Sequence, residues 1–315
     1  LLVQRETLRV EVAQKEVPWQ IASEAIIPRD LAGNPIPVPN DATKQLGMAV
    51  FMGLILGTGA ALLVEKFRNV FSTTEDIRDA MAEWPVLEVP SFALSTSQVS
   101  KNTAVSESGE KNRVEHSNAS LILETFISLY ASIRFLTSDS PVRSLVVCSP
   151  ERDDGKTTTA LHLAQAAAIK GQKVLLVDAN LRQPQLHTAL GLPNLQGLSN
   201  ILCENLEPQQ FIQRSPLDNN LFLLTAGQLL TDSTRLLAST RMQHLIKEFQ
   251  KDFDLVIYDT SHLLGFADTK FIAADTDGLL MVVRVGKTHR SGVMQVLNQL
   301  NSSNLPILGI VANQV

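Results

Sequence analysis

Short apolar runs separated by longer amphipathic segments recur along the second half of the chain. Runs of this length that are almost wholly apolar are typical of strands buried on both faces of a sheet. Because helix-length segments lie between most of them, the pattern predicts an α/β fold with a mainly parallel sheet covered by helices on both faces. The predicted strands are residues 145–148, 173–177, 221–224, 254–258, 278–285 and 306–311.

A longer apolar run, at residues 46–64, has a different meaning. It contains no charged residue, and in a helix it is long enough to cross a hydrocarbon core of roughly 30 Å. A buried core helix is the alternative, but such helices are usually shorter or carry a polar stripe. Gly53 and Gly57 also have the spacing of close helix packing in lipid. The run therefore predicts a transmembrane helix at 46–64.

The segments beside this run are polar or rich in proline. The prolines of residues 27–40 favour extended chain, since each fixes its own φ and restricts the residue before it. After the run, Thr73 is expected to open a short helix that ends at Met81. Residues 85–90 are expected to be extended.

Composition then divides the chain into parts. Residues 91–118 are rich in Ser, Asn, Lys and Glu, which predicts a flexible linker. A further domain is expected to start near Ala119 with an amphipathic helix at 121–133. The predicted parts are 1–45, 46–64, 65–118 and 119–315.

Charge and cysteine content narrow the classes of function. The net charge of −5 gives no indication of nucleic-acid binding. Cys148 and Cys203 are too few for a disulfide framework, so reduced thiols are expected. The chain begins at Leu1 without a charged-then-apolar leader, and we expect it to be a piece of a longer protein.

Residues 149–159 read Ser-Pro-Glu-Arg-Asp-Asp-Gly-Lys-Thr-Thr-Thr and join the first short apolar run to an Ala- and Leu-rich helical segment. Strand, loop, Gly-Lys-Thr and helix in this order are the arrangement of a P-loop. Backbone N–H groups of such a loop and the helix N-terminus face an anion. Lys156 is then expected to reach the β- and γ-phosphates of a nucleotide, and the Thr157 hydroxyl to lie on Mg²⁺.

The loop departs from the general pattern at two places. Pro150 stands where the pattern has Gly, and Asp153 and Asp154 bring carboxylates beside the phosphate site, which is unfavourable unless they point away. A chance Gly-Lys-Thr on a turn is the alternative interpretation. The chain offers such a case at 286–288, where no apolar helix start and no paired carboxylates follow, and we interpret that one as ordinary.

Polar side chains stand at the ends of three predicted strands. Asp178 follows 173–177, Asp259 follows 254–258, and Asn313 comes shortly after the last run. The carboxyl ends of parallel strands meet at the edge of the sheet where ligands bind. The two carboxylates are therefore expected to hold Mg²⁺ directly or through water. Asn313 is expected to present a donor and an acceptor to a base edge.

This combination resembles the bacterial tyrosine kinases of the polysaccharide co-polymerase type, which regulate capsule and exopolysaccharide export. Residues 149–157 are similar to the family's Walker A motif, 175–182 to its Walker A′ motif and 255–260 to its Walker B motif. The resemblance covers nearly the whole chain. Residues 1–45 look like the membrane-proximal end of a periplasmic chain-length determinant domain, and 119–315 look like the cytoplasmic P-loop kinase domain.

The resemblance implies roles for individual residues, with ATP and Mg²⁺ as cofactors. Lys156 binds phosphate, Asp259 binds Mg²⁺ with Thr157, and Asp178 activates the tyrosine hydroxyl or organises the metal. Asn313 is expected near adenine. The implied catalytic residues are Lys156, Asp178 and Asp259; the implied metal residues are Thr157, Asp178 and Asp259; the implied nucleotide contacts are Asp154, Gly155, Lys156, Thr157, Thr158, Arg182 and Asn313.

The same resemblance implies a place and partners. The expected location is the inner membrane, with the polysaccharide export machinery as a partner. Because ATP is cytosolic, the residues from 65 onward are expected inside and 1–45 outside. The family's ring-forming Glu-x-x-Arg-x-x-Arg motif is replaced by Glu124, Ile127 and Tyr130, so charge-assisted self-association is expected to be weakened.

Departures from the family keep three functions open. Asn180 stands where the Walker A′ motif usually has a second Asp, and Ser261 and His262 replace two prolines after the Walker B motif. The family's C-terminal tyrosine cluster is missing from this sequence. The first function is an ATP-dependent tyrosine kinase. The second is a degenerate nucleotide-binding module with a structural role. The third function is a partition-type ATPase, a class that usually has an additional Lys where Glu151 stands.

Overall fold

The computed structural model describes residues 29, 31–34, 42–89, 109–135, 141–228 and 232–314, without the side chains of 61–68 and 109–119. Contacts divide the chain into two compact units, Leu1–Val64 and Glu65–Val315, and each is described by itself. The predictions made for residues 1–28, 35–41 and 90–108 lie outside the described residues.

The first unit contains most of helix α2, Ala42–Arg68. The predicted helix at 46–64 is therefore present, and large apolar side chains such as Phe51 and Leu56 are 64% and 67% exposed. The predicted membrane span is not confirmed, because no helix within the described residues is both long enough and apolar enough to cross a membrane. Residues 31–34 form a turn in which Gly33 has φ 82°, so the prediction of extended chain is wrong there.

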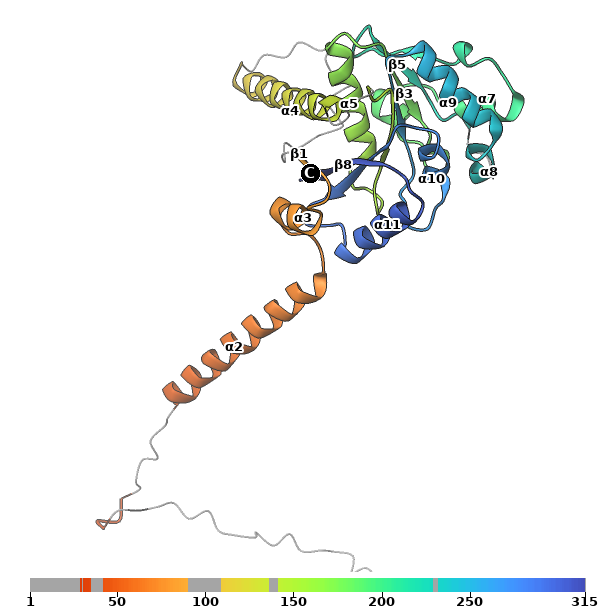
Figure 1. The fold of residues 1–315 in the computed structure, drawn as a ribbon. Helices are drawn as coiled ribbons and strands as arrows, with labels where there is room; N and C mark the ends of the chain where they lie inside the picture. The colour runs from red at the N-terminus through yellow and green to blue at the C-terminus, as the bar shows by residue number, and fades with distance from the viewer. Residues whose placement is uncertain are drawn as a thin grey trace, which may run out of the picture. The chain divides into compact units, whose positions relative to one another are not determined.

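The second unit is built on one eight-stranded sheet (Figure 1). Its strands lie in the order β1-β8-β7-β2-β6-β3-β5-β4, and every neighbouring pair is parallel except β4 with β5. The predicted parallel sheet is thus confirmed. The strands are β1 Val86–Val89, β2 Ser144–Cys148, β3 Val174–Asp178, β4 Gln213–Arg214, β5 Leu221–Leu224, β6 Leu255–Asp259, β7 Leu279–Arg284 and β8 Ile307–Asn313.

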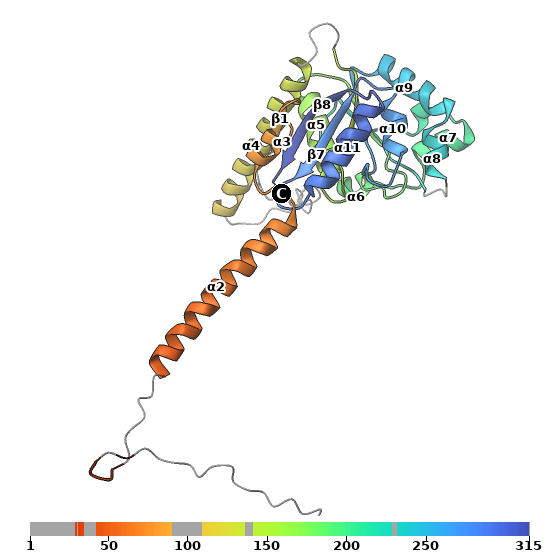
Figure 2. The same cartoon turned by 60° about the horizontal axis from the view of Figure 1, so that its bottom comes forward.

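Helices cover both faces of this sheet (Figures 1 and 2). Since successive side chains of a strand point to opposite faces, the side chains of the central strands alternate between two buried layers. Leu145 and Val147 of β2 pack with α4 (Gly109–Phe135), α5 (Lys156–Ile169) and α6 (Leu186–Leu190). Val146 and Cys148 face the other layer. That layer contains α3 (Thr74–Ala80), α7 (Leu198–Glu204), α8 (Ser233–Leu237), α9 (Thr240–Asp252), α10 (Asp268–Ala273) and α11 (Arg290–Ser302), while the short 3₁₀ helix η2 spans Pro208–Gln210.

The segment before the linker belongs to this unit. The Thr73 hydroxyl accepts a hydrogen bond from the Asp76 N–H in a capping box, which confirms the predicted helix start. The predicted extended segment at 85–90 contains β1, which pairs with β8 at the edge of the sheet. The compact unit therefore begins at Glu65, well before the domain start expected near Ala119.

The predicted linker is too long at its C-terminal end, because α4 begins at Gly109. Residues 109–118 carry few apolar side chains, which argues against a buried core but not against a helix. Glu, Lys and Arg have favourable helix propensities, so a polar segment can extend an amphipathic helix into solvent. The prediction treated low hydrophobicity as absence of structure, and for 109–118 this is wrong.

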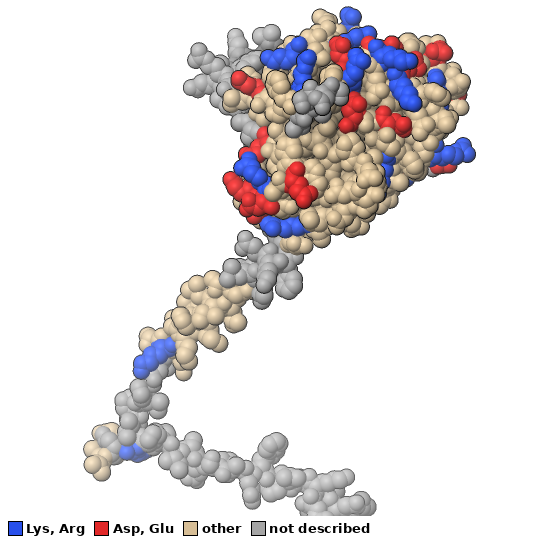
Figure 3. Space-filling model, viewed as in Figure 1, with Lys and Arg blue, Asp and Glu red and all other residues tan. Residues whose placement is uncertain are grey.

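Charges on the face in view are mixed. Lys and Arg side chains lie interspersed with Asp and Glu over the described surface of the second unit (Figure 3). This distribution agrees with the modest net charge of −5. On that face, neither sign dominates a continuous area of the described residues.

Candidate functional site

The loop between β2 and α5 has a left-handed backbone at two positions, Asp153 and Gly155. Gly155 has φ 94°, and a Cβ there would lie 2.2 Å from Asn313 Nδ2, so only glycine fits without a shift. Asp153 has φ 56°, a left-handed conformation that Asp tolerates less easily than glycine. The loop leads directly into α5 with Gly155 as the N-cap.

The first turn of α5 and the ends of two strands converge, as predicted. Asp178 and Asp259 are partners in the register of β3 and β6, which places the two carboxylates on neighbouring strands. The Thr157 hydroxyl donates a 2.6 Å hydrogen bond to Asp259 Oδ2. Lys156 is 8% exposed, and the ion pairs found within the described residues do not include its ammonium group.

Asp259 has the features of a carboxylate that receives a cation. It is fully buried, and its Oδ1 has no hydrogen-bond partner within the described residues. Burial raises the pKa of Asp259 to about 6, although the Thr157 hydroxyl and the Lys156 charge lower it. A buried oxygen without a partner is costly. Asp259 and the Thr157 hydroxyl are hard oxygen ligands and therefore fit Mg²⁺.

Asp178 is engaged differently. Its Oδ1 accepts a hydrogen bond from the Asn180 N–H at 3.2 Å and its Oδ2 accepts one from the Leu186 N–H at 3.1 Å. Burial and the neighbouring Asp259 hold the pKa of Asp178 well above its usual range. Its carboxylate thus fixes the loop after β3. Across the described part of the chain, no group of three or more His, Cys, Asp and Glu side chains is placed to hold a metal ion.

The Asp154 carboxylate is buried within the loop. From the sequence, a carboxylate beside the phosphate site was expected to be unfavourable unless it pointed away from the phosphates. Asp154 Oδ2 accepts a 3.1 Å hydrogen bond from the Glu151 N–H, and Asp154 Oδ1 lies 3.5 Å from Lys287 Nζ. Burial raises the pKa of Asp154 despite these contacts. Asp154 is not among the residues that line the neighbouring cavity.

A cavity of about 550 Å³ lies at this edge of the sheet. Most of the predicted nucleotide contacts line it: Gly155, Lys156, Thr157, Thr158, Arg182 and Asn313. The prediction missed other residues that line it: Arg152, Gln183, Gln185, Phe266 and Arg284, while Asp153, Asn180, Ser261 and His262 had been noted for other reasons. The order of strands brings these residues together, and it is not visible in the sequence.

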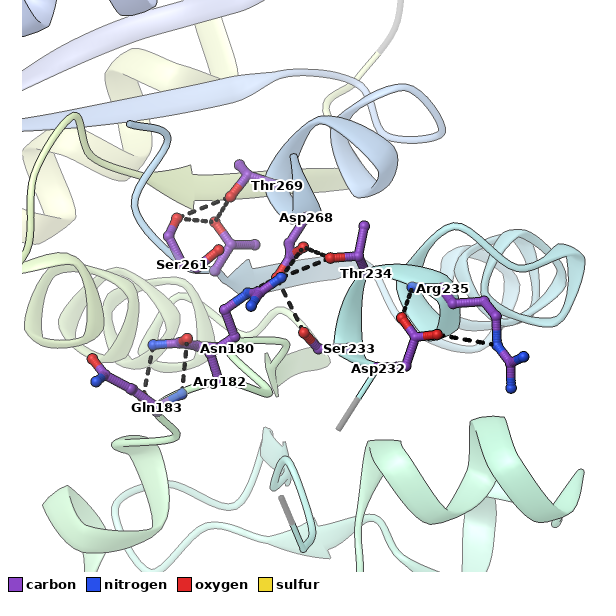
Figure 4. A network of polar contacts seen from close by, with 11 residues as sticks. Asn180, Arg182, Gln183, Asp232, Ser233, Thr234, Arg235, Ser261, Asp268 and Thr269 are labelled. Atoms are coloured by element: carbon purple, nitrogen blue, oxygen red, sulfur yellow. Dashed lines mark hydrogen bonds and ion pairs between the residues drawn. The ribbon is translucent and has the colours of Figure 1, made fainter. Parts of the chain in front are cut away.

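Arg182 lies in a polar network at one wall of the cavity (Figure 4). Its guanidinium donates to both oxygens of Asp268, at 2.6 and 3.2 Å, and to the Thr234 hydroxyl at 2.7 Å. It also lies 4.3 Å from the centroid of the Phe266 ring. A bidentate pair with a buried carboxylate fixes the guanidinium, so Arg182 is a rigid wall of the cavity as well as a predicted nucleotide contact.

Asn313 and Asn180 both use their amides within the protein. The Asn313 Nδ2 group donates to the Asp154 carbonyl oxygen at 2.8 Å, which joins the end of β8 to the loop. The Asn180 Nδ2 group donates to the Gln183 carbonyl oxygen at 2.7 Å, and its Oδ1 accepts from the Gln183 N–H at 3.3 Å (Figure 4). The Asn180 side chain therefore closes a local turn.

The two residues that replace prolines lie beside the metal-binding candidates. Ser261 is 4% exposed, and its hydroxyl oxygen has no hydrogen-bond partner within the described residues. The His262 ring makes an edge contact with Phe266 at 4.8 Å. Burial and nearby cations, Lys156 first, lower the pKa of His262. The lowered pKa favours the neutral form of the imidazole.

Ile127 and Tyr130, which replace the arginines of the family's ring-forming motif, lie on α4. The Tyr130 side chain is 9% exposed and packs into the core between α4 and the sheet. Its hydroxyl accepts a 3.3 Å hydrogen bond from Arg134. Ile127 packs against the same core. These side chains help to attach α4 to the sheet, and the weakened self-association stays a prediction.

Comparisons with known proteins agree with this geometry. A family model described as an AAA domain matches residues 153–305. The chain is 34% identical over 194 residues to tyrosine-protein kinase YwqD of Bacillus subtilis (strain 168), a match that covers 62% of this chain and 81% of YwqD. It is 26% identical over 315 residues to putative tyrosine-protein kinase EpsB of Ralstonia solanacearum, which covers 99% of this chain but only 41% of EpsB.

Solved structures with the same fold carry related names. The crystal structure of the chimerical protein CapA2B2 matches with a TM-score of 0.66 and 26% identity, over 77% of this chain and 99% of that chain. The kinase domain of Escherichia coli tyrosine kinase ETK matches with a TM-score of 0.59 and 28% identity, over 62% of this chain and 76% of that chain.

Proposed function

Because the chain belongs to the bacterial tyrosine kinases of capsule and exopolysaccharide biosynthesis, we propose that its second unit transfers the γ-phosphoryl group of ATP to a tyrosine hydroxyl. The observation that carries the proposal is the convergence of Lys156, Thr157 and Asp259 at one edge of the sheet. Phosphoryl transfer needs positioning and neutralisation of charge, with little covalent chemistry from the protein. A buried ammonium beside a loop of backbone N–H groups supports both requirements.

Each residue has a role in this proposal. Lys156 neutralises charge on the β- and γ-phosphates, and burial strengthens that interaction because little water screens it. Thr157 and Asp259 would hold Mg²⁺, and the ion would supply positive charge that neutralises the phosphates. Asp178 is the second carboxylate of the site, and its hydrogen bonds to backbone N–H groups support a role in fixing the loop that carries Asn180 and Arg182.

Nucleotide binding and transfer are tested in one series. The full chain is incubated with labelled ATP, Mg²⁺ and a tyrosine-rich acceptor peptide, and label on the peptide is measured. Lys156→Ala, at the start of α5, is compared with Lys170→Ala, an exposed residue at its other end. We expect transfer by the wild type and Lys170→Ala and a loss of at least about a hundredfold in Lys156→Ala. Equal transfer by all three proteins would refute the proposal.

A nucleotide-binding module without transfer is the second candidate, and the Asn180 amide favours it. Both ends of that amide are used by Gln183, so the position supplies no second charged oxygen to the metal region. In this case the wild type would bind Mg-ATP with dependence on Lys156 but leave the acceptor peptide unlabelled. A partition-type ATPase has less support, because Glu151 interacts with His289 at 2.9 Å and brings no cation to the site.

Location and partners are further parts of the proposal. We place the protein at the inner membrane in contact with the polysaccharide export machinery, with 65–315 on the cytoplasmic side and 1–45 outside. The family supports this, and so do the exposed apolar side chains of α2, which are costly in water. Fractionation of cells that express the full chain or a form without residues 42–68 tests it. Equal release of both forms into the soluble fraction would refute the proposed location.

A further inference from the structure

The second Gly-Lys-Thr, at residues 286–288, lies directly against the P-loop, although its sequence context indicates an ordinary turn. Lys287 Nζ donates a hydrogen bond to the Arg152 carbonyl oxygen and lies 3.5 Å from Asp154 Oδ1. Arg284, the last residue of β7, donates from Nη1 to the Asp153 carbonyl oxygen at 3.1 Å. Two cations therefore hold two consecutive carbonyl groups of the loop.

The segment that carries these cations is itself anchored. The Gly286 N–H donates to the Phe71 carbonyl oxygen at 2.7 Å, and the Arg284 N–H donates to the Thr288 hydroxyl at 2.8 Å. Phe71 and Thr288 are both fully buried. Beyond the turn, the His289 N–H donates to Glu151 Oε1 at 3.3 Å, which adds a third tie to the P-loop. These hydrogen bonds fix the backbone of the segment that carries Arg284 and Lys287.

The orientation of those two carbonyl groups has a consequence for anion binding. A trans peptide is planar, so the C=O of one residue and the N–H of the next point in opposite directions. Holding the carbonyls of Arg152 and Asp153 therefore fixes the N–H groups of Asp153 and Asp154. Asp153 is in the left-handed conformation with φ 56°, which a non-glycine residue leaves readily unless its surroundings hold it.

We propose that Lys287 and Arg284 are positioning residues for the nucleotide: they hold the P-loop backbone in the form that presents its N–H groups to phosphate. A P-loop binds phosphate through the directions of its backbone N–H groups, so a loop that relaxes loses affinity without losing any phosphate-contacting side chain. The effect is shared by ADP and ATP, because the loop surrounds phosphates common to both. The inference rests on the nucleotide binding proposed above.

The alternative is a surface pair without a role in binding. The Lys287 side chain is 37% exposed, although its partner Asp154 is fully buried, and ion pairs between solvent-exposed charges contribute little to stability. The two roles give different results when nucleotide affinity and the stability of the nucleotide-free protein are measured separately. A surface pair changes neither, and a purely structural residue lowers both.

The test titrates the full chain with Mg-ADP and with Mg-ATP by calorimetry and measures thermal unfolding without nucleotide. Lys287→Met keeps the length of the side chain but removes its charge and donors, Lys287→Arg restores both, and Lys247→Met removes an exposed lysine of α9 as the control. We expect Lys287→Met to weaken both nucleotides by roughly tenfold with an unchanged unfolding midpoint. Lys287→Arg and Lys247→Met should bind within about twofold of the wild type.

Unchanged affinity in Lys287→Met would overturn the inference, as would equal weakening in Lys247→Met. If Lys287→Met also lowers the unfolding midpoint, Arg284→Met removes the tie to the Asp153 carbonyl together with a side chain that lines the cavity. Wild-type affinity in that variant would overturn the inference. A wild type that fails to bind Mg-ADP refutes the proposed nucleotide site instead, so the two failures are distinct.

Discussion

Thr157 Oγ1 donates a 2.6 Å hydrogen bond to Asp259 Oδ2, and this bond joins the first turn of α5 to the end of β6. It leaves Asp259 Oδ1 without a partner within the described residues. One buried carboxylate oxygen thus accepts the hydroxyl, and the second is available to a cation. The relationship therefore connects the helix that carries the phosphate-binding loop to the proposed metal ligand.

Thr157→Ala should abolish the Mg²⁺-dependent part of nucleotide binding. The substitution removes one proposed ligand and leaves both Asp259 oxygens without a hydroxyl, and a hydrogen bond to a charged group contributes about 1.5–3 kcal/mol. We expect ADP affinity in the presence of Mg²⁺ to fall roughly tenfold or more, while affinity measured with chelator stays unchanged. Thr157→Ser keeps the hydroxyl and should behave as the wild type in the same calorimetric titrations. Full Mg²⁺ dependence in Thr157→Ala would contradict the assignment.

Gly155→Ala should disrupt the loop because two independent constraints act at this position. The residue has φ 94°, and its added Cβ would meet Asn313 Nδ2 at 2.2 Å, which breaks the bond from Asn313 to the loop. Gly171→Ala is the matched control, since it has φ 85° but nothing within 4 Å of an added Cβ. Strain alone costs about 1 kcal/mol. In urea unfolding, Gly155→Ala should lose about 2 kcal/mol more than Gly171→Ala; equal losses would show that the Asn313 contact does not matter.

The strand pattern was predicted well because it depends on local sequence. Apolar runs buried on both faces read directly as strands, and the predicted run at 221–224 coincides with β5, Leu221–Leu224. The other five predicted strands are confirmed within one or two residues at their ends. β1 was expected only as extended chain, because its pairing with β8 joins residues more than 200 positions apart, a relationship that no local pattern contains.

The sequence predicts those site residues that belong to a recognisable motif. It does not predict residues that reach the site only because distant elements meet in the fold. Lys156, Thr157 and Asp259 follow from spacing at strand ends, and the structure brings them together. Arg284 was not predicted, because its contact with the loop depends on the order of β7 and β2 in the sheet. The role of Lys287 was missed for the same reason.

Asp268→Asn should remove part of the acid sensitivity of the fold. Burial alone would raise the pKa of Asp268, but hydrogen bonds from Arg182 and Thr234 hold it below the usual value. A carboxyl whose pKa is lower in the folded state adds stability above the unfolded value of about 4, and this is lost as the pH falls through the folded value. The stability lost by Asp268→Asn should therefore be largest near about pH 6 and shrink below about pH 4.

Urea unfolding at a series of pH values measures this difference. Asp252→Asn, at the exposed end of α9, is the control and should follow the wild type at every pH. A loss in Asp268→Asn that is the same at all pH values would show that the lowered pKa of Asp268 does not contribute. The result also reports on Arg182, whose guanidinium loses its bidentate partner in this variant.

Asn180→Asp tests whether restoring the family's second carboxylate restores chemistry. The resemblance to the family implies that Asn180→Asp combined with Asp153→Gly raises the rate of transfer, because the pair returns a negative charge to the metal region and removes one from beside the phosphates. The contacts of Asn180 predict otherwise. Its Nδ2 group donates to the Gln183 carbonyl oxygen at 2.7 Å, and an Asp oxygen in that place would face another oxygen. The new charge would also lie close to the buried Asp178, whose Oδ1 already accepts the Asn180 N–H.

We therefore expect Asn180→Asp to lose about 1–3 kcal/mol of stability, as for a buried polar group left without its partner, and to show no gain in transfer to the acceptor peptide. Asn180→Ala removes both hydrogen bonds to Gln183 without adding charge, so a larger loss in Asn180→Asp than in Asn180→Ala isolates the repulsion. Unfolding midpoints and transfer rates are measured on the same preparations. A faster transfer rate at wild-type stability would show that the turn at 180–183 rearranges around Mg²⁺ and nucleotide, and that the missing carboxylate alone had limited the reaction.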